Sequence, residues 1–129
     1  MAKPKVYRLG DLQLKIMKVL WRRPEPTTVA EVHETLSDEG KLAYTTIATM
    51  LRKMEARGLV RHRVEERKFF YSAAVQAEEM TRNISAHFLD RLFEGSLADM
   101  LAHLLTTQEI SREELARLEE LIAKQKEKP

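Results

Sequence analysis

The chain has 129 residues, of which 43% are hydrophobic and 33% charged, and its formal net charge is +2. Such a length normally gives one domain, or one domain with an appendage, and enough apolar residues to form a core. The absence of cysteine excludes disulfides, thiolate metal sites and cysteine nucleophiles, and it suits a reducing cytoplasm. No apolar run approaches the ~20 residues of a membrane span, and no signal-peptide core follows the basic N-terminus.

The net charge conceals two halves of opposite sign. Residues 1–74 contain 15 Lys and Arg against 9 Asp and Glu, whereas residues 75–129 contain 7 against 11. A basic half followed by an acidic half is typical of a polyanion-binding domain joined to a protein-interaction segment. Two ordinary surfaces that differ by chance are the alternative.

The basic half is predicted to contain three helices. Apolar residues at helical spacing predict the first over residues 9–22. Thr27 or Thr28 can cap the second, which we expect to close near Gly40. The third is predicted over residues 42–57, and its buried stripe would consist of Ile47, Met50, Leu51 and Met54.

A β-hairpin is predicted after Gly58, a residue well placed for a left-handed helix C-cap. Residues 59–64 and 68–72 are rich in β-branched and aromatic side chains, as strands usually are. Residues 65–67 would form the turn. None of them is the glycine or asparagine that usually supplies the positive φ of a tight hairpin.

The acidic half is predicted to be helical throughout. A long helix over residues 75–93 would be broken at Gly95, and a second, capped by its first serine, would cover residues 96–105. Ser111 with a glutamate three residues later resembles a capping box and would open the last helix. We expect the tail over residues 124–129 to fray.

The third helix and the hairpin together predict a winged helix-turn-helix that binds DNA. The fold would be mainly α with a small β-hairpin wing, followed by a C-terminal helical dimerisation segment. A helix that begins with threonines can approach the major groove closely and offer hydroxyl and methyl groups to base edges, while arginines and lysines of a wing bind phosphates. The candidate DNA contacts are Tyr44, Thr45, Thr46, Thr49 and Lys53 in the helix and Arg61, Arg63, Arg67 and Lys68 in the wing.

The same residues allow other interpretations. Thr45 and Thr46 could simply cap a solvent-exposed helix, and the hairpin could be an ordinary basic surface. The four histidines (His33, His62, His87 and His103) match no metal-ligand spacing, and no nucleotide-binding or nucleophile motif occurs. We therefore expect no metal, no cofactor and no enzymatic activity.

The C-terminal helices carry more apolar surface than three short helices can bury in one another. Apolar patches of that kind usually mark interfaces, and a two-fold dimer would present two recognition helices about 34 Å apart on a palindromic site. A compact monomer is the alternative. The candidate dimerisation residues are Leu89, Leu92, Phe93, Leu97, Met100, Leu101, Leu104, Leu105, Leu115, Leu118 and Ile122.

Residues 9–121 resemble the penicillinase-repressor family of the BlaI/MecI/CopY type. The resemblance lies in five segments, namely residues 12–21, 44–51, 57–60, 69–71 and 95–97. It implies a dimeric repressor that binds dyad operators and blocks promoters of antibiotic-resistance or stress genes. By the same likeness, Thr46 and Thr49 would contact bases or phosphates.

The chain also differs from the family's pattern. Copper-responsive members end in a cysteine cluster, which is missing here. Members that respond to β-lactams are inactivated by proteolysis at an Asn-Phe bond in the penultimate helix, and the resemblance implies a membrane sensor-protease as a candidate partner. The corresponding pair in this chain is His103 and Leu104. The wing usually carries a glycine near Glu66.

The combined interpretation is a cytoplasmic, homodimeric repressor. Residues 6–74 would form the DNA-binding domain, residues 75–123 the dimerisation domain and residues 124–129 a frayed tail. The alternative is a winged-helix protein-interaction module without a specific operator.

Overall fold

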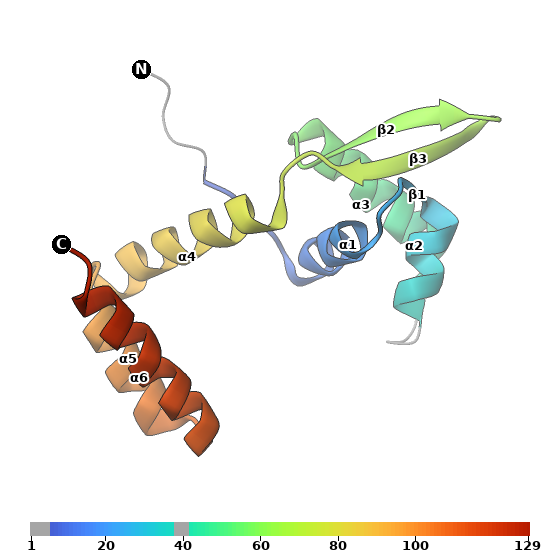
Figure 1. The fold of residues 1–129 in the computed structure, drawn as a ribbon. Helices are drawn as coiled ribbons and strands as arrows, with labels where there is room; N and C mark the ends of the chain where they lie inside the picture. The colour runs from blue at the N-terminus through green and yellow to red at the C-terminus, as the bar shows by residue number, and fades with distance from the viewer. Residues whose placement is uncertain (1–5, 38–41) are drawn as a thin grey trace. The chain divides into compact units, whose positions relative to one another are not determined.

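The computed structural model describes residues 6–37 and 42–129, and it divides into two compact units, Met1–Ser85 and Ala86–Pro129. The division falls inside one helix, α4 (Ala77–Phe93). The elements of the first unit are drawn from blue to yellow in Figure 1. In chain order they are α1 (Asp11–Arg22), β1 (Thr27–Thr28), α2 (Val29–Leu36), α3 (Tyr44–Ala56), β2 (Val60–Glu65), β3 (Lys68–Ala73) and the start of α4.

The small antiparallel sheet has the strand order β1-β3-β2. Residue pairs such as Thr27 with Tyr71 and His62 with Tyr71 define its register. The fold is therefore mainly helical with a hairpin wing, as the sequence predicts. Strand β1 is an addition, because two threonines before a helix indicate only a cap. Thr28 does cap α2, but the helix ends at Leu36, earlier than the predicted end near Gly40, a position that lies outside the described residues.

The wing turns tightly without glycine. Glu65 and Lys68 are a paired position of the ladder, so Glu66 and Arg67 alone make the turn. Both have left-handed backbone conformations, with φ of 49° and 67°. Two positive φ values give the mirror-image turn whose twist matches that of a hairpin. The chain thus forms the usual tight turn and accepts the strain of about 1–2 kcal/mol per non-glycine residue.

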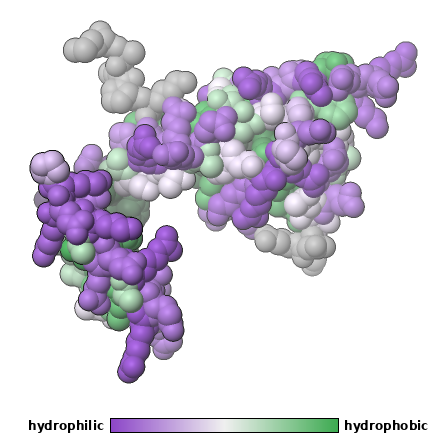
Figure 2. Space-filling model, viewed as in Figure 1, coloured by the Kyte–Doolittle hydropathy of each residue, from purple (hydrophilic) through white to green (hydrophobic). Residues whose placement is uncertain are grey.

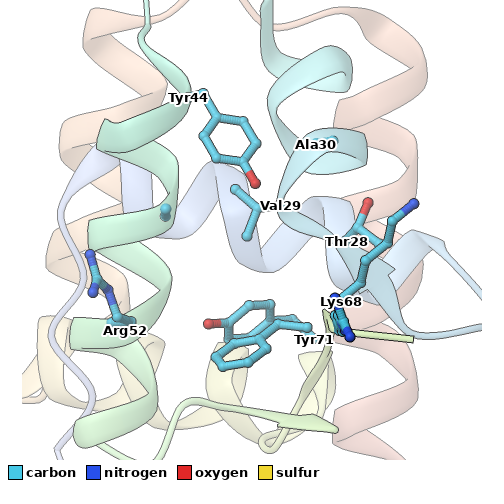
Figure 3. Close-up of a pocket in the computed structure, with 10 residues that line it drawn as sticks. Thr28, Val29, Ala30, Tyr44, Arg52, Lys68 and Tyr71 are labelled. Atoms are coloured by element: carbon cyan, nitrogen blue, oxygen red, sulfur yellow. The ribbon is translucent and has the colours of Figure 1, made fainter. Parts of the chain in front are cut away.

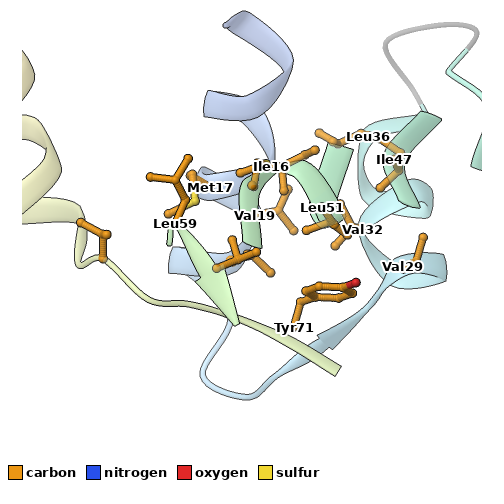
Figure 4. Close-up of a cluster of buried hydrophobic side chains, with 14 of the residues drawn as sticks. Ile16, Met17, Val19, Val29, Val32, Leu36, Ile47, Leu51, Leu59 and Tyr71 are labelled. Carbon is orange, nitrogen blue, oxygen red and sulfur yellow. The ribbon is translucent and has the colours of Figure 1, made fainter. Parts of the chain in front are cut away.

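One hydrophobic core holds the first unit together (Figure 4). Ile16, Met17, Ile47 and Leu51 are fully buried, and the aromatic ring of Tyr71 lies among residues of that core at 2% exposure. Met50, which the sequence assigns to the buried stripe of α3, is only half-buried. It lies at the edge of the core.

The winged unit extends beyond the predicted boundary after residue 74. Val75 and Met80 are buried in the same core, at 4% and 1% exposure. The Trp21 indole Nε1 also donates a hydrogen bond of 2.9 Å to the carbonyl oxygen of Val75. The first turns of α4 therefore belong to the winged unit. Periodicity alone predicts a helix there but not where its buried contacts change.

The second unit contains the rest of α4, then α5 (Leu97–Thr107) and α6 (Arg112–Lys126). Gly95, with φ of 82°, ends the preceding helix, and the Ser96 hydroxyl caps α5 by accepting from the Asp99 amide at 3.1 Å. Helix α6 continues through Lys126, so the first half of the tail predicted to fray over residues 124–129 is helical.

Neither α5 nor α6 contains a buried residue. Figure 2 shows apolar residues exposed between hydrophilic ones on this unit. Among the described residues, no helix combines the length and apolar content required to cross a bilayer.

Candidate nucleic-acid interface

The outward face of α3 presents unoccupied hydroxyl groups. The N-cap of this helix is Ala43, whose carbonyl oxygen accepts from the amides of Thr46 and Ile47 at 3.0 and 3.3 Å. Thr45, Thr46 and Thr49 are exposed, and their hydroxyls make no hydrogen bond within the described part of the chain. The threonines are therefore not caps, and their hydroxyls are available to a ligand.

The opposite face of α3 fixes the helix in the core. Ile47, Leu51 and Met54 are each 0% exposed, at the spacing of one helical stripe. Lys53 is exposed one turn beyond Thr49. A helix held on one side by full burial presents the other side in a fixed orientation, which is what recognition of a rigid groove requires.

The wing divides its cations between two faces. Side chains alternate along a strand, so Arg61 and Arg63 lie on the face opposite to His62. Arg63 forms an ion pair with Glu65, with Nη2 3.1 Å from Oε2, and its guanidinium carbon lies 6.0 Å from the centre of the Phe70 ring. Arg63 is thus partly engaged within the wing, whereas Arg61 makes no such contact among the described residues.

A cleft of about 480 Å³ opens between α2, α3 and the wing (Figure 3). Tyr44 and Ala48 of α3 line it on one side and the wing lines it on the other, with the nearly buried Tyr71 among its lining residues. Its cations are Arg52, Arg67 and Lys68. None of these three forms an ion pair within 4.0 Å in residues 6–37 or 42–129.

Two ionisable groups beside the cleft have shifted pKa values. Burial raises the pKa of the Tyr71 hydroxyl, and the nearby carboxylate of Glu55 raises it further, so this phenol stays neutral. Hydrogen bonds from Thr28 lower the pKa of Glu31, and Arg23 and Lys68 lower it further. Glu31 therefore stays charged, but it does not line the cleft, whose charged lining residues are Arg52, Arg67 and Lys68.

The nine predicted contacts thus fall into three groups. Thr45, Thr46, Thr49 and Lys53 share the exposed face of α3; Tyr44, Arg67 and Lys68 line the cleft; Arg61 and Arg63 occupy the other face of the wing. The sequence prediction omits Arg52. Helical spacing could have identified it, because it follows Thr49 by three positions and is exposed beside Lys53.

The histidines do not gather into a metal site. Two have structural partners, with His33 Nε2 2.8 Å from the Leu42 carbonyl oxygen and His62 Nδ1 2.7 Å from Glu55. Within the described residues there is no group of three His, Asp or Glu that could hold a metal ion.

The predicted dimerisation residues separate by exposure. Leu89, Phe93, Met100, Leu101 and Leu118 are half-buried within their own unit. The more exposed ones are Leu92 (62%), Leu97 (54%), Ile122 (48%), Leu105 (45%), Leu104 (40%) and Leu115 (39%). Phe88 and Leu121, each 50% exposed, were not among the predicted residues. A substantial apolar surface therefore stays uncovered in a single copy.

The family model described as penicillinase repressor matches residues 9–124. The chain belongs to the penicillinase repressor family. A penicillinase repressor from Bacillus licheniformis is 30% identical over 122 residues, covering 95% of this chain and 94% of that protein. The family resemblance that the sequence indicates is confirmed.

A second relative of the family, the transcriptional regulator BlaI of Mycobacterium tuberculosis, is 38% identical over 98 residues. The match covers 76% of this chain but only 62% of the mycobacterial protein. Among solved structures, the DNA-binding domain of the repressor BlaI superposes with a TM-score of 0.51 at 28% identity. That match covers 60% of this chain and 93% of the solved domain.

Proposed function

We propose that this member of the penicillinase repressor family is a DNA-binding transcriptional repressor. It binds a dyad operator as a homodimer in the cytoplasm and represses transcription by occluding the promoter. The winged unit reads DNA, and the helical unit that follows Ser85 joins two copies. The observation that carries the proposal is the exposed face of α3, where the hydroxyls of Thr45, Thr46 and Thr49 have no partner among the described residues. Beside this face lies a cleft whose cations form no ion pair with those residues.

Each group of residues takes a distinct part in this proposal. Threonines and Lys53 on α3 enter the major groove, where short side chains reach base edges. Arg67 and Lys68 at the wing tip bind backbone phosphates, as does Arg52 in the cleft, and these contacts supply affinity and salt dependence. Tyr44 packs against the sugar-phosphate backbone at the mouth of the same cleft.

Electrophoretic mobility shift with the promoter region upstream of the protein's own gene and of its neighbours tests DNA reading. Thr46→Ala should reduce discrimination between the operator and unrelated DNA, at ~1–3 kcal/mol for a lost base contact. Arg52→Gln should weaken binding to both and reduce the salt slope by about one. If the wild type retards all DNA fragments without sequence preference, the claim of a specific operator is wrong and a protein-interaction module is favoured.

The homodimer rests on the apolar residues that one copy leaves uncovered. Leu92 and Leu97 are 62% and 54% exposed, and α5 and α6 hide no residue completely. A helix pair with this much exposed leucine is stabilised by burying it against an equivalent surface. Closed two-fold symmetry uses the same patch on both copies, and it places two recognition helices on a palindrome.

Light scattering on the double variant Leu92→Glu with Leu104→Glu tests the dimer. Two buried carboxylates per copy should abolish association, and the loss of avidity should weaken operator binding by ~10²-fold or more. Glu119→Gln together with Glu120→Gln alters two charges on α6 without removing apolar surface, and it should leave the dimer intact. An unchanged mass for the leucine variant would refute the interface.

The regulated genes are proposed from the relatives, which are named penicillinase repressor and transcriptional regulator BlaI. Antibiotic-resistance genes are the first candidates, with a membrane sensor-protease as the inducing partner. His103 and Leu104 lie within α5, and the His103 carbonyl oxygen accepts hydrogen bonds from Thr106 and Thr107. Cleavage there therefore requires local unwinding of α5. Mass spectrometry after induction with a β-lactam tests whether this bond is cut.

A further inference from the structure

The recognition helix and the wing are joined by a side-chain pair outside the proposed DNA contacts. Nδ1 of His62, in β2, lies 2.7 Å from both carboxylate oxygens of Glu55, in α3. A carboxylate can only accept, so Nδ1 carries the proton and donates. The His62 and Glu55 side chains are 27% and 32% exposed, which shields the bond partly from water.

Aromatic neighbours hold the imidazole in place. The His62 ring stacks on Phe69 with a centroid separation of 4.2 Å and an interplanar angle of 12°. It also lies 5.5 Å from the ring of Tyr71, its cross-strand partner in the ladder. A ring packed against two others loses little further freedom when it donates to Glu55, so the bond orients both elements at low entropic cost.

Among the described residues, this bond is the outermost polar contact between the wing and α3. Leu59 and Val60 anchor the base of the hairpin in the core, at 1% and 2% exposure. Beyond His62, every residue from Arg63 to Phe69 is exposed. Strand β3 is held one position further out by the pairing of Phe70 with Thr28, and the distal wing, which carries Arg67 and Lys68, extends beyond these two contacts.

The charge of Glu55 makes its position informative. A carboxylate next to a surface that binds a polyanion weakens binding electrostatically. A carboxylate beside a DNA-binding surface therefore calls for a role that compensates for the affinity it costs. The contacts with His62 supply it, because they fix how the wing projects from the recognition helix.

We propose that Glu55 and His62 are a positioning pair that sets the angle of the wing, so that α3 and the wing tip engage one operator together. This rests on the proposed DNA-binding function. Neither residue touches DNA in this arrangement. Their effect on affinity arises from presenting the cations of the wing tip at the correct place.

Glu55 could act only as a negative charge or it could position the wing, and the two explanations predict opposite changes of operator affinity in Glu55→Ala. Fluorescence anisotropy measures this affinity. If Glu55 acts only as a charge, its removal strengthens binding. If it positions the wing, binding weakens, by roughly fivefold for a charge-assisted hydrogen bond that is partly exposed. Glu66→Gln removes the same charge from the wing turn and should strengthen binding by about twofold or leave it unchanged. Strengthening in Glu55→Ala to the level of Glu66→Gln overturns the proposal.

Conservative variants separate positioning from general destabilisation. Glu55→Gln keeps an acceptor for Nδ1, and His62→Asn places an amide donor near the Nδ1 position, so both should bind within about twofold of the wild type. His62→Ala should lose affinity like Glu55→Ala. The double alanine variant should lose no more than either single one, because the two residues act as a unit. If the affinity losses of the two single alanine variants multiply in the double variant, the two residues act independently and the proposed positioning pair is wrong.

A measurement without DNA keeps this proposal separate from the proposed function. Residual dipolar couplings of the wing amides report its orientation in the free protein. They should change in Glu55→Ala and His62→Ala but not in Glu66→Gln. If the wild type prefers no operator, the proposed function is wrong, but the couplings still test whether Glu55 and His62 set the angle of the wing. If the couplings of the alanine variants equal those of the wild type, the positioning pair is refuted.

Discussion

The two units of this chain bury their apolar residues in different ways. In the winged unit, Ile16, Met17 and Leu51 are fully enclosed by helices and a sheet of the same copy. In the helical unit, α5 and α6 contain no buried residue although both have an apolar stripe. The first unit is complete as a single copy. The second has the pattern of helices whose partner is supplied from outside.

Core truncation should separate the units most strongly. Leu51→Ala removes a side chain that is 0% exposed, and we expect it to cost the winged unit about 2–5 kcal/mol in free energy of unfolding. Leu105→Ala, at 45% exposure, should cost a monomeric helical unit less than ~0.5 kcal/mol. Urea denaturation followed by tryptophan fluorescence reports the first change, since Trp21 lies in the winged unit. Equal losses of unfolding free energy in Leu51→Ala and Leu105→Ala would contradict the difference in burial between the two units.

The two units should also differ in how their stability depends on protein concentration. If a second copy completes the helical unit, its unfolding free energy should rise by about 1.4 kcal/mol per tenfold increase in concentration. The winged unit, with a closed core, should show no such dependence. Circular dichroism at 222 nm across a concentration series, with Trp21 fluorescence as the reference for the winged unit, measures both. Parallel melting of both signals at all concentrations would argue for a closed helical unit.

How much the sequence predicts also differs between the units. In the winged unit, one-sided burial creates clear periodicity, so α3 and the hairpin were placed to within two residues at each end. The missing elements depend on tertiary contacts. Strand β1 exists because Thr27 meets Tyr71 across the sheet, and the unit extends to Ser85 because Met80 reaches the core. Neither contact leaves a local pattern.

The candidate site was predicted by residue type but not by arrangement. Threonines and arginines mark a DNA-facing surface, yet only the folded hairpin puts Arg61 and Arg67 on different sides of it. Arg52 lies in the second half of α3, beyond the first turns from which a recognition helix is expected to reach base edges. The bond between His62 and Glu55 could not be foreseen, because a histidine in a basic strand gives no indication of the carboxylate that it will meet.

Two helix caps of similar sequence allow a finer comparison. Thr28 and Glu31 form both halves of a capping box, with amide-to-side-chain distances of 3.1 Å each. At Ser111, the described contacts include only the half in which its hydroxyl accepts from the Glu114 amide. Thr28→Ala should therefore destabilise the winged unit by ~1 kcal/mol, and Ser111→Ala should cost the helical unit less. Thermal unfolding of both variants tests the order, and a larger effect at Ser111 would reverse it.

The smallest expected effect is the pH dependence conferred by Glu31. Hydrogen bonds from Thr28 hold the pKa of this carboxyl below its ordinary value of 4.5. The charged form is thus favoured by folding, and its contribution to stability is present above pH 4.5 and is lost as the pH falls through the lower folded value. Glu31→Gln should flatten the stability profile of the winged unit in that acidic range. Glu114→Gln, whose side chain bonds no cap amide among the described residues, is the matched control in α6. Profiles that stay equally steep in Glu31→Gln and the wild type would show that the complete capping box adds no charge-dependent stability, and that the two caps differ less than their contacts indicate.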